Sequence, residues 1–199
     1  MLNIGVLISG GGTNLQAIID ETKSGGINGT VKLVISNKEN AYGLERARLS
    51  KIKAVYETDE DKIIELLKEN NIDLIVLAGY LKIITPKFVD EFRNKIINIH
   101  PSLIPSFCGK GYYGEKVHQG VIDYGAKVTG ATVHFVDEGA DTGAIIMQEA
   151  VNVEQDDDAK SLAKRVLEVE HRILKESIRL FCENKLSISG YLSPTSLAK

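Results

Sequence analysis

Hydrophobic residues in the first half of the chain gather in short runs without polar alternation. Such runs are typical of strands buried on both faces of a parallel sheet. The segments between them place apolar residues at helical spacing, so strands and helices alternate. This order predicts a doubly wound α/β sheet. The predicted strands cover residues 2–8, 31–36, 73–78 and 96–99, and the predicted helices cover about 14–23, 42–50, 59–70 and 86–93.

The pattern changes after the fourth strand. Residues 101–113 contain two prolines and two glycines and indicate a loop, and a helix is expected near 114–124. The next apolar segments, 127–136 and 144–153, flank a turn-rich stretch, so we expect them to pair antiparallel. A long helix over about 158–184 should pack on the body through apolar residues at helical spacing. These are Leu162, Val166, Val169, Ile173, Leu174 and Ile178.

The absence of an internal repeat or linker predicts a single domain over 1–199. Hydrophobic residues make up 43% of the chain, and the net charge of −3 offers no basic field for nucleic acid. The amino-terminal apolar run lacks a basic region and is too short to span a membrane, so it is interpreted as a buried strand. Cys108 and Cys182 are too few for a disulfide framework. We therefore expect free thiols in a cytoplasmic protein.

Asn98 and His100 follow directly after the apolar run Ile96-Ile97. Side chains of an extended strand alternate between its faces, so residues two apart project in the same direction. Both side chains should lie at the carboxyl end of a strand, where open α/β sheets place their ligands. Pro101 then ends the strand. A hydrogen-bonding amide beside a group that titrates near neutrality suits acyl-type chemistry.

A glycine-rich segment, Ser9–Gln16, joins the first strand to the first helix. Glycines allow the backbone to approach a ligand, and free amides at a helix start favour an anion. The spacing is not that of a dinucleotide fingerprint, because Leu15 occupies the position of the third glycine. Two interpretations stay open from these residues alone: a phosphate site, or a tight turn with Thr13 as the helix cap.

Other polar residues have a structural interpretation beside a functional one. Asp141 lies in an acidic turn that is either solvated or contacts His100 and raises its pKa. His134 fits a core histidine that only satisfies its neighbours. His118 and His171 lie on predicted helices and default to structural or surface roles. The four histidines and the carboxylates show no ligand-like spacing, so no metal is expected.

The roles of segment 77–84 and of Glu170 also stay open from the residues alone. Apolar side chains in 77–84 follow a buried strand and either line a pocket for a flat heterocycle or continue the core. Glu170 on the last predicted helix is most simply an exposed charge on an amphipathic face.

Taken in this order, these segments resemble the phosphoribosylglycinamide formyltransferases, folate-dependent enzymes of purine synthesis. The resemblance runs from Asn3 to about Leu180. It implies a Rossmann-like formyltransferase fold, mostly parallel with an antiparallel carboxyl-terminal extension. The segments that carry it are Ser9–Gln16, Ser36–Lys38, Gly43–Ala47, Leu77–Val89, Asn98–Pro105, Gly130–Val136 and Asp141–Gly143.

The activity implied by the resemblance is formyl transfer from 10-formyltetrahydrofolate, a co-substrate, to the amine of glycinamide ribonucleotide, in purine (IMP) biosynthesis. The partners are then small molecules, and the chain is a monomer or homodimer. Carried over position by position, Asn98, His100 and Asp141 form the catalytic group. The implied substrate-binding residues are Gly12, Thr13, Asn14, Pro101 and Glu170. The implied folate-binding residues are Leu81, Lys82, Ile83, Ile84, Asn98, Asp137, Glu138, Gly139, Ala140 and Asp141.

These residue types suit the implied chemistry. As the amine attacks the formyl carbon, Asn98 would donate a hydrogen bond to the formyl oxygen and protonated His100 would stabilise its charge. His100 would also act as general acid toward the departing folate nitrogen. Asp141 would orient His100 and keep it protonated at neutral pH.

The chain differs in three places from what is common in the family. Residues 54–73 contain no arginine for the folate site, Glu115-Lys116 stands in place of Leu-His, and Ala144 in place of a proline. Three other functions stay open. A methionyl-tRNA formyltransferase would need a basic RNA surface, and a formyltetrahydrofolate hydrolase would use water in place of the amine. A catalytically silent nucleotide- or folate-binding protein would be marked by loss of a catalytic residue.

Overall fold

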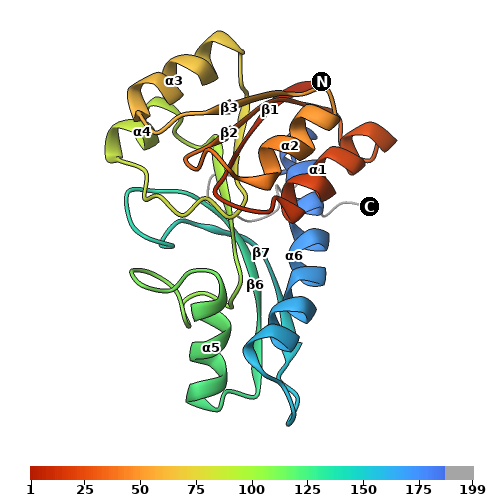
Figure 1. Ribbon diagram of the computed structural model, residues 1–199, viewed down its shortest axis with the longest axis vertical. Coiled ribbons are helices and arrows are strands. Elements are labelled where there is room, and N and C mark those ends of the chain that lie inside the picture. The colour runs from red at the N-terminus through yellow and green to blue at the C-terminus, as the bar shows by residue number, and fades with distance from the viewer. Residues whose placement is uncertain (187–199) are drawn as a thin grey trace.

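Seven strands form one mixed sheet in the computed structural model, which describes residues 1–186 (Figure 1). Their order is β3-β2-β1-β4-β5-β6-β7. The first five strands pair in parallel, and β6 pairs antiparallel with both β5 and β7. This confirms the mostly parallel sheet with an antiparallel extension. The strands are β1 (Leu2–Ile8), β2 (Gly29–Ser36), β3 (Lys53–Tyr56), β4 (Leu74–Leu77), β5 (Ile96–His100), β6 (Val128–Phe135) and β7 (Ile145–Asn152).

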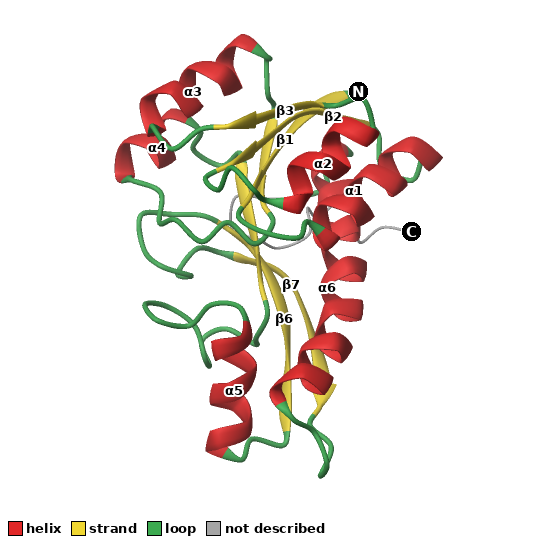
Figure 2. Ribbon diagram, viewed as in Figure 1, coloured by secondary structure: helices red, strands yellow, loops and turns green. Residues whose placement is uncertain are grey.

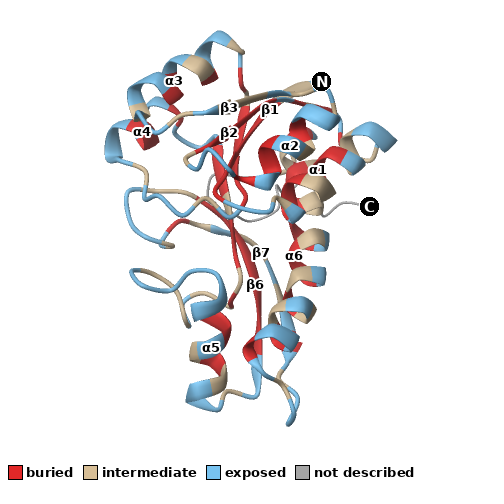
Figure 3. Cartoon of the chain, in the orientation of Figure 1, coloured by how far each residue is buried: buried red, intermediate tan, exposed pale blue. Residues whose placement is uncertain are grey.

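Helices cover both faces of the sheet, as Figure 2 shows. Ile4 and Val6 of β1 join the hydrophobic cluster that contains α1, α2 and α6, whereas Leu7 joins the cluster under α3 and α4. Figure 3 shows continuous buried stretches along the central strands. Because successive side chains point to opposite faces, both faces are buried, which explains the apolar runs without polar alternation. The helices are α1 (Thr13–Ser24), α2 (Tyr42–Leu49), α3 (Glu60–Glu69), α4 (Pro86–Glu91), α5 (Glu115–Tyr124) and α6 (Ala159–Cys182).

Most predicted elements are confirmed, but β3 was missed. It has four residues, lies at the edge of the sheet, and exposes Lys53 and Tyr56 at its two ends. So short a strand with polar or exposed ends produces no apolar run in the sequence. The interpretation of Thr13 as a helix cap is also wrong: α1 begins at Thr13, and Gly12 occupies the cap position in a left-handed conformation.

The long carboxyl-terminal helix α6 is confirmed in position and packing. The Asp158 carboxylate caps it by accepting hydrogen bonds from the backbone N–H groups of Lys160 (3.0 Å) and Ser161 (2.7 Å). All six apolar residues predicted to face the body are buried. The last part of the predicted single domain, 187–199, lies outside the described residues.

Candidate active site

A cavity of about 620 Å³ opens at the carboxyl ends of β1, β4 and β5. This is the edge at which open α/β sheets bind ligands, and the volume falls within the range of about 300–1,000 Å³ typical of small-molecule sites. Segments that are distant in the sequence meet here. They are residues 10–14, 77–84, 98–101 and 109–114, most of 136–141, one residue each of α5 and β6, and two of α6.

Asn98 and His134 face each other inside this cavity, because the antiparallel register pairs them across β5 and β6. The Asn98 amide nitrogen Nδ2 lies 3.1 Å from His134 Nε2 and 3.4 Å from Asp141 Oδ1. His134 Nδ1 lies 2.7 Å from the Phe135 carbonyl, which can only accept, so Nδ1 carries a proton. In the neutral ring Nε2 therefore accepts a hydrogen from Asn98.

His100 is buried beside Asn98, as the strand alternation predicted. Its Nε2 donates to the Phe107 carbonyl (3.0 Å), and its Nδ1 lies 3.6 Å from Asp141 Oδ2. Burial lowers the pKa of His100 below 6.5, although Asp141 and the Phe107 carbonyl act in the opposite direction. The expectation that Asp141 keeps His100 protonated at neutral pH is therefore wrong for this structure. Desolvation of the imidazolium outweighs the attraction of the carboxylate.

Asp141 contacts the other two predicted catalytic residues from a strained turn. Its φ is +59°, in the left-handed region that few residues other than glycine, asparagine and aspartate adopt. The Gly109 backbone N–H donates to its Oδ2 (2.9 Å). Burial acts to raise the pKa of Asp141, but His134, His100 and the Gly109 amide together hold it below its usual value. Asp141 is thus an anion that the surrounding donors hold in place.

The glycine-rich loop before α1 is fixed by α2. The Gly43 N–H donates to the Gly10 carbonyl (3.0 Å), and Arg46 Nε donates to the Gly11 carbonyl (2.8 Å). Gly12 has a φ of +71°, and a Cβ there would lie 2.8 Å from the Gly43 Cα. The amides at the start of α1 border the cavity, which is the arrangement expected of an anion site.

Asn14 links this loop to α6. Its Nδ2 donates to Glu170 Oε2 (2.8 Å), and its buried Oδ1 has no hydrogen-bond partner among the described residues. Glu170 is 8% exposed, so the interpretation of it as a solvated surface charge is wrong. Burial raises the pKa of Glu170, and the bond from Asn14 opposes that shift. A carboxyl group in this position can recognise polar groups of a ligand.

The structure brings nearly all the predicted site residues to one cavity. Glu138 is the exception: it does not line the cavity, and its carboxylate instead accepts from Arg93 (2.7 Å) on the surface. The predicted residues that line the cavity are Gly12, Thr13, Asn14, Leu81, Lys82, Ile83, Ile84, Asn98, His100, Pro101, Asp137, Gly139, Ala140, Asp141 and Glu170.

The cavity also contains two histidines for which the sequence predicts no catalytic or binding role: His134, expected in the core, and His118, expected to be structural or on the surface. His134 contacts Asn98, and only the register of β5 with β6 reveals this. His118 of α5 is 4% exposed, and its Nδ1 has no partner among the described residues. Burial and the neighbouring His100 lower the pKa of His118 to about 4. The sequence alone does not predict that His134 and His118 lie in this cavity, because the residues that surround them come from separate elements.

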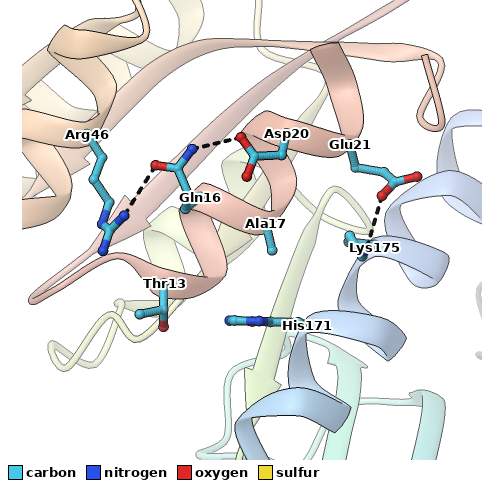
Figure 4. A pocket seen from close by; sticks show the side chains of 8 residues that line it. All are labelled: Thr13, Gln16, Ala17, Asp20, Glu21, Arg46, His171 and Lys175. Carbon is cyan, nitrogen blue, oxygen red and sulfur yellow. Dashed lines mark hydrogen bonds and ion pairs between the residues drawn. The ribbon is translucent and has the colours of Figure 1, made fainter. Parts of the chain in front are cut away.

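A second cavity of about 390 Å³ lies between α1, α2 and α6 (Figure 4). Its charged side chains are already paired. Lys175 binds Glu21 (3.0 Å), Gln16 Nε2 donates to Asp20 (2.8 Å), and Arg46 donates to the Gly11 carbonyl. The remaining basic side chain, His171, has a pKa lowered by burial and by Lys175. These pairings leave little net charge to attract a ligand, so the larger cavity is the candidate active site.

Within residues 1–186 there is no group of three or more histidine, cysteine, aspartate or glutamate side chains arranged to hold a metal ion. No helix in that range has the length and apolar character needed to cross a bilayer. Cys108 and Cys182 are both free thiols, as predicted.

Comparison with known proteins gives consistent matches. Residues 2–178 match the family model described as Formyl transferase. The chain is 43% identical over 212 residues to a phosphoribosylglycinamide formyltransferase from Haemophilus influenzae, covering 100% of this chain and 97% of that protein. It is 40% identical over 193 residues to a chloroplastic phosphoribosylglycinamide formyltransferase from Arabidopsis thaliana; the match covers 92% of this chain but 66% of that relative's length. A crystal structure of glycinamide ribonucleotide transformylase 1 from Symbiobacterium toebii matches with a TM-score of 0.89 and 44% identity, covering 94% of this chain and 91% of that one.

Proposed function

The chain belongs to the formyl transferase family, and we propose that it transfers the formyl group of 10-formyltetrahydrofolate to the amine of glycinamide ribonucleotide in purine biosynthesis. One observation carries the proposal. Asn98, His100 and Asp141 are in contact in a cavity that the amide-rich start of α1 also lines. An acyl-transfer group and an anion site in one cavity suit an amine substrate that carries a phosphate.

On the nucleotide side, Gly12, Thr13 and Asn14 would bind the phosphate through the amides at the start of α1. Glu170, held by Asn14, would contact the sugar or the glycinamide portion, and Pro101 would border it. Binding at the phosphate fixes one end of the substrate, so the amine at the other end is held near the formyl carbon.

On the catalytic side, Asn98 would donate to the formyl oxygen as negative charge develops there. Its bond to His134 is the shorter one, so the formyl oxygen can replace the 3.4 Å contact with Asp141 while His134 holds the amide. Neutral His100 would take the proton that the amine loses on attack and return it to the folate nitrogen that leaves. The Asp141 carboxylate would stabilise the imidazolium while the proton is carried.

On the donor side, the segment from Leu81 to Ile84 and the turn Asp137–Asp141 would line the pocket for 10-formyltetrahydrofolate. Backbone groups and apolar side chains of these segments suit a flat heterocycle. Lys82 adds an exposed cation to this lining, and its Nζ donates to the Thr58 carbonyl (2.8 Å).

Two broader inferences accompany this function. We infer a single formyltransferase domain, since one sheet contains every strand of residues 1–186. A cytoplasmic location and a monomeric or homodimeric state stay predictions, and the Arabidopsis relative is chloroplastic by name.

The assay that tests the function mixes purified protein with 10-formyltetrahydrofolate and glycinamide ribonucleotide and follows folate deformylation by absorbance. Turnover that requires the ribonucleotide supports transfer. Turnover with the folate alone would instead identify a hydrolase, and folate binding without turnover would identify a binding protein. The variant His100→Ala should lose most of the transfer activity, roughly 10²- to 10⁴-fold for loss of a proton-transfer group.

A further inference from the structure

The hydroxyl of Ser9 joins the ends of three strands. Ser9 directly follows β1 and is 3% exposed. Its Oγ donates to Oδ1 of Asn37, which directly follows β2, at 2.6 Å. The same oxygen accepts the backbone N–H of Leu81, in the segment after β4, at 2.8 Å. A hydroxyl carries one hydrogen and two lone pairs, so both bonds are made at the same time.

The two cavity-lining segments on either side of Ser9, the glycine-rich loop and the Leu81 segment, depend on this hydroxyl to different degrees. The glycine-rich loop that follows Ser9 has anchors of its own, from Gly43 N–H to the Gly10 carbonyl and from Arg46 to the Gly11 carbonyl. Leu81 itself is 48% exposed, so packing of its own side chain does little to hold its backbone. The Ser9 hydroxyl supplies the bond that holds the Leu81 amide.

We propose that Ser9 is a positioning residue for the formyl donor, fixing the Leu81 segment at a set distance from the glycine-rich loop. This inference rests on the proposed function, because it assigns the Leu81 segment to the donor pocket. Ser9 does not line the cavity and does not touch the reacting atoms. It acts through the Leu81 backbone, and loss of its hydroxyl should weaken donor binding more than nucleotide binding.

Ser36 provides a matched control. It is the last residue of β2 and fully buried, and its Oγ donates to the Lys38 carbonyl (2.9 Å) and accepts the Lys38 N–H (3.0 Å). Its hydroxyl therefore makes the same two kinds of bond as that of Ser9, but within its own loop. Neither serine lines the cavity. Ser36→Ala should cost similar stability without releasing the Leu81 segment.

The kinetic test compares Ser9→Ala and Ser36→Ala with the unchanged protein. Ser9→Ala removes the part-buried partner of the Leu81 N–H and of the Asn37 side-chain carbonyl, so the Leu81 segment should loosen and the KM for 10-formyltetrahydrofolate should rise by about tenfold. The kcat and the KM for glycinamide ribonucleotide should change by less than about threefold, as should all three constants in Ser36→Ala. An equal rise of the donor KM in both variants, or no rise in Ser9→Ala, would overturn the proposal.

A second measurement does not depend on turnover. Amide hydrogen exchange over 78–85 should be faster in Ser9→Ala than in Ser36→Ala, because the Leu81 N–H has lost its acceptor. If Ser9→Ala does not fold, Asn37→Ala replaces it; this variant keeps the Ser9 oxygen but frees its hydroxyl, and the donor KM should rise two- to threefold as a rough expectation. Unchanged exchange at Leu81 would refute the positioning role. A lack of transfer by the unchanged protein would refute the proposed function itself.

Discussion

The Asn98 amide nitrogen lies 3.1 Å from Nε2 of His134, across the antiparallel pair of β5 and β6. The Phe135 carbonyl holds the hydrogen on the other ring nitrogen, so the ring presents a lone pair to Asn98. An amide held in this way keeps its N–H groups, rather than its carbonyl, directed toward Asp141. His134 thereby fixes the orientation of the group that we propose donates to the formyl oxygen.

Replacing His134 by phenylalanine should impair catalysis more than binding. The ring is 2% exposed, and phenylalanine fills a similar space but cannot accept from Asn98. We expect kcat to fall roughly 10- to 100-fold, as for other losses of a preorganising contact, with both KM values changed less than about threefold. His171→Phe, on α6 beside the second cavity, is the control and should leave kcat unchanged. Equal kcat values in the two variants would argue against an orienting role for His134.

The variant Asp141→Asn separates charge from backbone strain. Asparagine tolerates the φ of +59° that Asp141 adopts, whereas alanine does not. Asp141→Asn should therefore fold with a Tm close to that of the unchanged protein, while kcat falls roughly 10²- to 10⁴-fold because the imidazolium of His100 loses its partner. Asp141→Ala should lose about 1–2 kcal/mol of stability in addition. Near-normal kcat in Asp141→Asn would remove Asp141 from the catalytic group.

The pH dependence of kcat/KM should report the state of His100. Burial holds the pKa of His100 below 6.5, so the neutral ring that takes the proton is formed as the pH rises. Activity should increase with pH and level off, with an inflection below pH 6.5. Because the Asp141 carboxylate raises the pKa of His100, Asp141→Asn should move that inflection to lower pH. Activity that instead declines between pH 5 and 7 would indicate that protonated His100 is required.

Protonation of His118 should reduce stability in acid. Its pKa is about 4 in the folded chain and about 6.5 when unfolded, so between these values the unfolded chain binds more protons. The stability that His118 contributes is complete above pH 6.5 and is lost as the pH falls toward 4, to the extent of roughly 2–3 kcal/mol. Denaturant unfolding of His118→Phe across this range should show a shallower decline. An unchanged slope would mean that other groups dominate the acid response.

The glycine at position 12 should be required for the fold of its loop. A side chain there would need a φ of +71° and a Cβ 2.8 Å from the Gly43 Cα. Gly12→Ala should lower the free energy of unfolding by about 1–3 kcal/mol. Gly11→Ala is the control, because a Cβ there meets nothing within 4 Å. Its free energy of unfolding should change by less than about 0.5 kcal/mol. Equal losses in the two variants would show that the loop adapts.

Local pattern was enough to predict most of the fold. The strands and helices follow from the spacing of apolar residues, and the pairing of Asn98 with His100 follows from strand alternation alone. The edge strand β3 is not predicted from the local pattern, because four residues with exposed ends produce no periodic signal. The burial of Glu170 is not predicted from the local pattern either, because its contact with Asn14 spans 156 positions in the sequence.

By itself the sequence determined most of the elements, all but the edge strand β3, and which strand end carries the amide and the imidazole. That information is local, since it depends on the alternation of side chains within one element. The tertiary structure decided which residues those groups meet and in which protonation state. It placed His134 against Asn98 through the β5–β6 register, and it buried His100 so deeply that its pKa falls despite Asp141. Register and desolvation arise only when distant segments pack together, so no single segment contains them.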